Sequence, residues 1–154
     1  MVGGLKEMNI PSSDSYLEYE AVYVNSTRTQ GFLVWYNSDG KEMARFKATS
    51  GSGSPKYFTL PEGDYVGSNF NTSSNTLFMR DGIGFTVRLG PSKVWDTNKK
   101  AYRIGLLIHP ARYSGTQGCI GLIDNSKQIL NFRYLISSYL QINRSINVAA
   151  TVKK

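Results

Sequence analysis

The 154-residue chain contains one cysteine and one histidine. A single cysteine excludes an intramolecular disulfide and leaves the redox character of the compartment open. Because structural zinc sites draw most of their ligands from cysteine and histidine, no metal site is predicted. No apolar run approaches the roughly 20 residues of a membrane-spanning helix, so we expect no membrane span. The N-terminal residues lack the basic start and apolar core of a signal peptide, and we expect action at the place of synthesis, export by another route, or a removed leader.

The chain also has few acidic residues, and basic residues outnumber them. The net charge is +7, from 18 Lys and Arg against 11 Asp and Glu. Such a charge raises the encounter rate with polyanions, of which nucleic acid, anionic lipid and the acidic bacterial cell wall are examples. The basic residues are scattered in runs no longer than two and accompany no recognition motif, so we expect no nucleic-acid partner.

The composition is that of a globular protein, with 40% hydrophobic residues and 15 glycines, and the length predicts a single domain over residues 1–154. Residues 1–15 are polar and predict a flexible N-terminal arm. Apolar and polar residues alternate from Leu17 to Val24, as in a strand. Further strands are predicted at 31–36, 41–49, around Tyr65, 76–79, 84–89, 103–109 and 146–152, with an Asp-Gly turn joining the first two of these.

One helix is predicted, at about 126–140. Its apolar residues recur with helical spacing, and Asn125 or Ser126 is placed to cap its start. Strands that are mostly antiparallel, with one late helix, predict a mainly β fold: a small β-sandwich or open barrel.

The histidine and the cysteine lie close together in "IHPARYSGTQGCIG", residues 108–121. His109 ends an apolar run, Pro110 stops that strand's hydrogen bonding, and the following loop returns the chain to Gly118 and Cys119. An imidazole near a thiol accepts its proton and leaves a reactive thiolate. Backbone amides around Gly118 and Cys119 are then candidates for an oxyanion hole. The alternative is a small buried cysteine and an unrelated half-buried histidine, and spacing alone leaves both open.

This segment resembles the catalytic motif of the YkuD-type L,D-transpeptidase domain, in which a strand-ending histidine precedes a loop and a Ser/Thr-x-Gly-Cys-aliphatic sequence. The matching residues are His109, Thr116, Gly118, Cys119 and Ile120. Upstream, "ATSGSGSPKYFTLPEGDYV" is similar to that family's strand ending in Ser-Gly, here Ser50 and Gly51, and to its Pro-x-Gly-x-Tyr turn, which ends here at Tyr65. The resemblance covers residues 46–122.

The chain departs from the family at two positions. Gln117 stands where typical members have a second histidine, and Gly121 stands where they have an arginine. With its short loop between histidine and cysteine, the chain more closely resembles compact antibacterial effectors of type VI secretion and related phage proteins. Arg112 in the loop is a candidate to pair with a peptide carboxylate in place of the missing arginine.

The resemblance implies a peptidoglycan-modifying cysteine enzyme without a cofactor, acting in the bacterial periplasm or cell wall. Cys119 would attack the stem peptide before a terminal D-alanine, and His109, held by the carbonyl of Pro110, would serve as base and acid. The thioester would then meet water (L,D-carboxypeptidase) or an amine (L,D-transpeptidase or D-amino-acid exchange). The expected partners are peptidoglycan stem peptides, with an immunity protein or a secretion or phage assembly as further candidates.

Several residues are expected to contact substrate: Arg112, Ser114, Thr116, Gln117, Ser50, Gly51 and Tyr65. Two alternatives remain open beside this function. One is a non-catalytic wall-binding module on the same fold, and the other is a cysteine peptidase that cuts other wall peptides.

Overall fold

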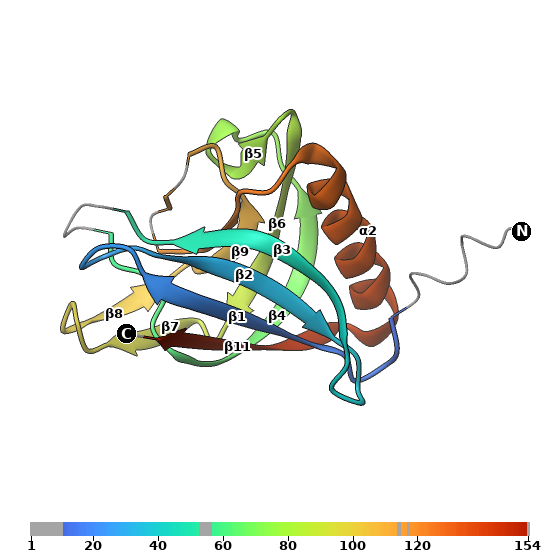
Figure 1. Cartoon of the computed structure of the whole chain (residues 1–154), viewed down its shortest axis with the longest axis horizontal. Coiled ribbons are helices and arrows are strands. Elements are labelled where there is room, and N and C mark those ends of the chain that lie inside the picture. The colour runs from blue at the N-terminus through green and yellow to red at the C-terminus, as the bar shows by residue number, and fades with distance from the viewer. Residues whose placement is uncertain (1–10, 53–56, 114, 117, 154) are drawn as a thin grey trace, which may run out of the picture.

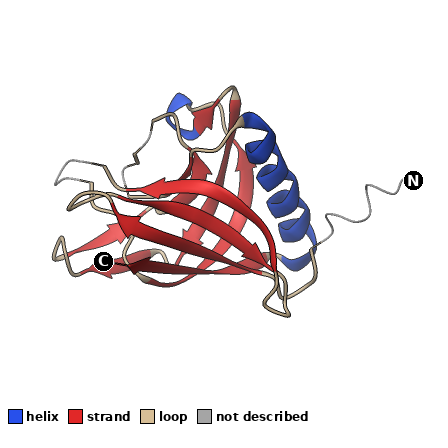
Figure 2. Ribbon diagram, in the orientation of Figure 1, coloured by secondary structure: helices blue, strands red, loops and turns tan. Residues whose placement is uncertain are grey.

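The computed structural model describes residues 11–52, 57–113, 115–116 and 118–153. Strands dominate it, as Figure 2 shows. The first half contains β1 (Tyr16–Tyr23), β2 (Thr29–Tyr36), β3 (Glu42–Ser50), β4 (Gly63–Thr72), the 3-10 helix η1 (Thr76–Phe78) and β5 (Met79–Arg80). The second half contains β6 (Ile83–Gly90), β7 (Lys93–Asp96), β8 (Ala101–Ile104), β9 (Leu107–Pro110), β10 (Ile120–Leu122), α2 (Ser126–Asn143) and β11 (Ser145–Lys153).

The main sheet curls into a barrel. Its strand order is β4-β11-β1-β2-β3-β10-β9-β6-β5, and a further pairing between β4 and β6 closes the ring. Figure 1 shows the strands wrapped around a common interior, with α2 along one side. Most pairs are antiparallel, whereas β1–β11 and β9–β10 are parallel. The predicted class, mainly β with one late helix, is confirmed.

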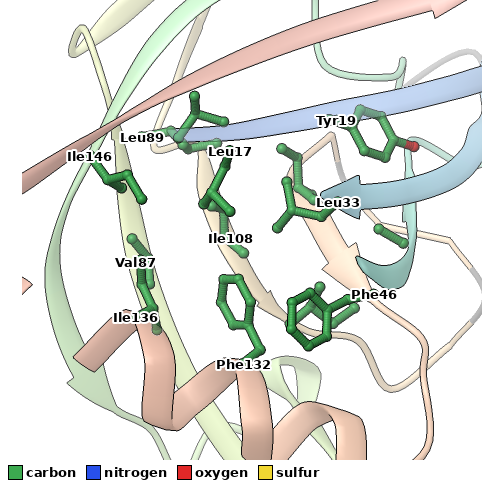
Figure 3. Packing of buried hydrophobic residues seen from close by; sticks show 14 of the residues in the cluster. Leu17, Tyr19, Leu33, Phe46, Val87, Leu89, Ile108, Phe132, Ile136 and Ile146 are labelled. Carbon is green, nitrogen blue, oxygen red and sulfur yellow. The ribbon is translucent and has the colours of Figure 1, made fainter. Parts of the chain in front are cut away.

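The interior is filled by side chains that alternate along the strands. Leu17 and Tyr19 of β1 point inward, as the sequence pattern predicts, and β2 and β3 form the predicted hairpin. In Figure 3 the Phe132 and Ile136 side chains of α2 reach into the same cluster. The helix is therefore held mainly by its apolar face rather than by intrinsic propensity.

The helix begins and ends with identifiable caps. Asn125 is the N-cap, and its side-chain oxygen accepts a hydrogen bond from the Gln128 amide at 2.9 Å. The helix runs to Asn143, one turn beyond the predicted end, because the next residue, Arg144, takes a positive φ of 67° and donates its amide to the carbonyl of Leu140. Across the described residues, no helix is long and apolar enough to cross a membrane.

Two expectations about local structure need correction. Residues 76–79 were expected to be a strand, but Thr76–Phe78 form η1, whose start is capped by the side chain of Asn75. Residues 103–109 were expected to be one strand, but Gly105, with φ +67°, separates β8 from β9. This break lets β8 pair with β7 while β9 joins the main sheet.

Of the expected N-terminal arm, residues 1–10 lie outside the described part of the chain, and residues 11–15 are described. Ser15 is buried, and its hydroxyl donates to the carbonyl of Ser12. The Ser12 hydroxyl in turn lies 3.4 Å from side-chain oxygens of Asn37 and Ser38 in the β2–β3 turn. The end of the expected arm is therefore packed on the barrel.

Candidate active site

His109 and Cys119 lie on neighbouring strands of the main sheet. His109 is on β9, and Cys119 comes directly before β10, which runs parallel to β9. The register pairs Ile120 with Ile108, and both of these side chains are fully buried in the core. Because side chains alternate along strands, the cysteine and the histidine both face away from the core. Gly121, which has no side chain, is the residue paired with His109.

Both residues line one cavity of about 670 Å³. Its walls come from η1, the β8–β9 junction and the loop between β9 and β10. The described lining residues are Arg28, Ser52, Tyr57, Leu77, Phe78, Arg103, Ile104, Gly105, Leu106, Leu107, His109, Arg112, Tyr113, Gly115, Thr116 and Cys119. Among these described residues there are three arginines and no acidic side chain, so the cavity favours an anionic ligand.

The imidazole of His109 is fixed on two sides. Its Nδ1 lies 2.7 Å from the carbonyl oxygen of Pro110, and its ring lies 4.7 Å from the ring of Phe78. Because a carbonyl only accepts hydrogen bonds, Nδ1 carries the proton, and in the neutral ring Nε2 is then the proton acceptor. His109 is only 4% exposed, and this burial lowers its pKa, against a smaller opposing effect of the Pro110 carbonyl. The ring is therefore neutral at pH 7.

Cys119 is also buried, with 9% exposure. Its Sγ lies 4.0 Å from the carbonyl oxygen of Gly105, to which the thiol donates. Burial raises the pKa of this thiol, and the Leu107 backbone and Arg103 partly oppose the rise. Both groups are therefore neutral at rest: Cys119 is a thiol rather than the expected thiolate, and His109 is a neutral imidazole. Within the described residues no hydrogen bond joins the two groups, a looseness common in enzymes without substrate.

Thr116 organises the turn that carries the cysteine. Its hydroxyl donates to the carbonyl of Cys119 at 2.7 Å and accepts from the amides of Gly51 and Gly118, each at 3.1 Å. One donated and two accepted bonds use the full capacity of a hydroxyl. The Gly118 amide, expected as an oxyanion donor, is therefore engaged within the protein.

Three residues expected to contact substrate lie behind the cavity wall. Ser50 is buried, accepts from the amide of Leu60 at 2.9 Å and donates to the carbonyl of Gly118 at 3.3 Å. The carbonyl of Gly51 accepts a hydrogen bond from the Thr116 amide, and the Gly51 amide donates to the Thr116 hydroxyl. Tyr65 is buried and donates to the carbonyl of Pro61 at 2.5 Å. These three residues, expected to contact substrate, hold the fold around the site and are not among the described residues that line the cavity.

Of the four other residues expected to contact substrate, two line the cavity and two are not described. Arg112 and Thr116 line the cavity, and the exposed guanidinium of Arg112 lies 5.2 Å from the ring of Tyr113. Ser114 and Gln117 lie outside the described residues.

Sequence reasoning missed Arg103. It lines the cavity, is 8% exposed and forms an ion pair of 2.8 Å with Asp96, which is 2% exposed. The available signal was one arginine inside the apolar run that leads to His109, because a charge in a buried strand needs a partner or a function. Comparison with family models, with curated proteins and with solved structures finds no match.

Proposed function

We propose that the chain is a cysteine enzyme of the L,D-carboxypeptidase or L,D-transpeptidase type, which acts on peptidoglycan stem peptides in the bacterial periplasm or cell wall. The observation that carries the proposal is the hydrogen bond from Nδ1 of His109 to the carbonyl of Pro110, at 2.7 Å. It leaves Nε2 as the basic nitrogen in a cavity that also contains Cys119. The motif resemblance around these residues supplies the substrate class.

The reaction starts from two neutral groups. Sγ of Cys119 attacks the carbonyl carbon that precedes the terminal D-alanine, while the thiol proton moves to Nε2 of His109. The carbonyl electron pair becomes an oxyanion. When this adduct collapses, the C–N bond breaks, and the imidazolium returns the proton to the amine of the leaving D-alanine. Water or an amine then cleaves the Cys119 thioester.

The charge of the cavity supports a substrate with a free carboxylate. Arg112 at the exposed loop and Arg28, which is half-buried, both line the cavity. An arginine recognises a carboxylate through parallel N–H donors. A terminal D-alanine carries its carboxylate directly beside the bond that is cleaved, whereas a residue inside a longer peptide has an amide at that position. The cavity therefore favours removal or exchange of a terminal residue over cleavage within a chain.

The test is mass spectrometry of purified disaccharide-tetrapeptide after incubation with the protein. Wild type is expected to release D-alanine, or to exchange it when another D-amino acid is added. Cys119→Ala is the matched control, because it removes one sulfur from a buried site. It is expected to leave the substrate unchanged, and His109→Gln is expected to lower the rate by a factor of about 10² or more.

Two results would contradict the proposal. Equal product with Cys119→Ala would place the chemistry elsewhere, and release of a larger peptide fragment instead of D-alanine would indicate a cysteine peptidase. Comparing tetrapeptide with its C-terminal amide isolates the carboxylate, since the amide is expected to react more slowly.

A wall-binding module is the second candidate, and one observation favours it. The outer face of the β7–β8 hairpin exposes aromatic and apolar side chains, with Trp95 half-exposed and its ring 5.1 Å from that of Tyr102. Exposed Trp and Tyr side chains of this kind are common at binding interfaces. Binding to intact peptidoglycan that Trp95→Ala abolishes, combined with no tetrapeptide turnover, would favour this function.

A further inference from the structure

Arg103 is a charged residue fixed inside the candidate active site. Its Nη1 donates to Oδ2 of Asp96 at 2.8 Å and to the carbonyl of Thr59 at 3.2 Å. The Oδ1 atom of Asp96 accepts from the amides of Asn98 and Lys99. Arg103 and Asp96 belong to β8 and β7, the hairpin at the left of Figure 1. The guanidinium is therefore held by the hairpin and has little freedom to turn away.

The other terminal nitrogen, Nη2, lies against the turn that carries the cysteine. A Cβ on Gly118 would overlap Nη2 and would lie 2.8 Å from Cζ of Arg103. Gly118 also has a φ of +105°, which side chains rarely tolerate. Both the conformation and the contact thus require glycine next to Cys119.

Nη2 is buried and has no hydrogen-bond partner within the described part of the chain. An unpaired charged donor in a protein interior is costly, and such groups in native structures call for an explanation. The nearby Gly118 amide does not provide the usual backbone donor, since it is bonded to Thr116. The site therefore has a fixed positive charge where a neutral donor was expected.

We propose that Arg103 supplies the positive charge that stabilises negative charge at Cys119 during the reaction. Negative charge first develops on the sulfur as its proton moves to His109, and it then passes to the oxyanion of the adduct. A fixed charge in a site with little water acts strongly, because no solvent reorganisation is needed. Asp96 is bonded through Nη1, so Nη2 is the part of the guanidinium that faces Gly118. The oxyanion role rests on the proposed function, and the thiolate role does not.

The direction of the thiol pKa agrees with this assignment. Arg103 lowers the pKa of Cys119 against the larger effect of burial. The other charged or titratable groups lining the cavity are Arg28, Tyr57, His109, Arg112 and Tyr113. The other two cationic side chains are more exposed than Arg103, so water screens their charges more strongly.

The test measures the alkylation rate of Cys119 by iodoacetamide as a function of pH, which requires no substrate. The main variant is Arg103→Gln combined with Asp96→Asn, which removes both buried charges and retains Oδ1 for the turn. At a pH below the thiol pKa we expect alkylation about tenfold slower than in wild type, which corresponds to a pKa about one unit higher. Arg103→Lys keeps the charge and is expected to stay close to wild type.

Arg45→Gln is the matched control, because Arg45 forms an Arg–carboxylate pair with Glu42 at 2.7 Å on the exposed surface of β3. It is expected to leave the alkylation profile unchanged. An unchanged profile in the folded double variant would overturn the proposal. If that variant does not fold, Arg103→Lys decides: a tenfold slower reaction with a wild-type circular dichroism spectrum would overturn the proposal, because the positive charge is kept and its effect is lost. A shifted profile without tetrapeptide turnover would support the charge effect and contradict the proposed function.

Discussion

The ring of Phe78 lies 4.7 Å from the imidazole of His109, with 47° between the two planes. Phe78 ends η1, the segment that the sequence predicted as a strand. The Pro110 carbonyl holds one edge of the imidazole, and Phe78 covers its face. A short helical turn that is distant from the His–Cys motif in the sequence therefore helps to fix the orientation of the proposed base.

We predict that Phe78→Ala lowers kcat by about tenfold, because loss of orientation costs activity without removing the base. KM is expected to change less, since Nε2 acts on the thiol and not on substrate binding. Steady-state kinetics would show this split. A rise in KM with constant kcat would instead place Phe78 in substrate binding.

The burial of His109 predicts that activity depends on pH in an unusual way on the acidic side. Burial lowers the pKa of His109, so the neutral ring persists below the usual value of about 6.5. Activity is expected to be level as the pH falls through about 6.5 and to decline only at more acidic values. A pH profile of kcat/KM measures this directly. Loss of activity centred on the ordinary histidine pKa would show that the ring is solvated in the working enzyme.

The same residue links stability to pH. In the unfolded chain His109 binds a proton near pH 6.5, whereas in the folded chain it does so only at lower pH. Between those values the unfolded state binds more protons, so the free energy of unfolding decreases as the pH falls. In His109→Gln this part of the decrease is expected to disappear. Urea unfolding at a series of pH values, for both proteins, provides the comparison.

Gly118→Ala should destabilise the fold through its conformation and its contact. A side chain at φ +105° costs about 1–3 kcal/mol, and the added Cβ also displaces Arg103. In an Arg103→Ala background the contact is gone and only the conformational cost remains. The two substitutions are therefore expected to be non-additive. Strictly additive free energies of unfolding would show that the guanidinium does not touch this turn in solution.

Alternation and turn chemistry were sufficient to predict most of the barrel. The β2–β3 hairpin and the start of α2 at Asn125 follow from local sequence. Ring closure through β4 and β6, and the parallel pairing of β1 with β11, depend on long-range contacts that no local pattern encodes.

The site was predicted less completely than the fold. His109 and Cys119 line one cavity; their spacing alone left this open, and the motif resemblance was the reason to expect it. Arg103 was missed because β8 and β9 were interpreted as one strand, which hid the turn at Gly105. Its partner Asp96 lies on β7, in a stretch where no strand was predicted.

Substitutions of Thr116 distinguish a structural role of its hydroxyl from a role in substrate contact. Thr116→Val preserves the shape of the side chain but removes the hydroxyl that serves Gly51, Gly118 and Cys119. Each buried polar group left unpaired costs about 1–3 kcal/mol, so we expect a loss of at least about 3 kcal/mol in the free energy of unfolding. Thr116→Ser keeps the hydroxyl and is expected to lose much less. Urea unfolding of both variants tests this. A Thr116→Val protein with wild-type stability and a raised KM would assign the hydroxyl to the substrate instead.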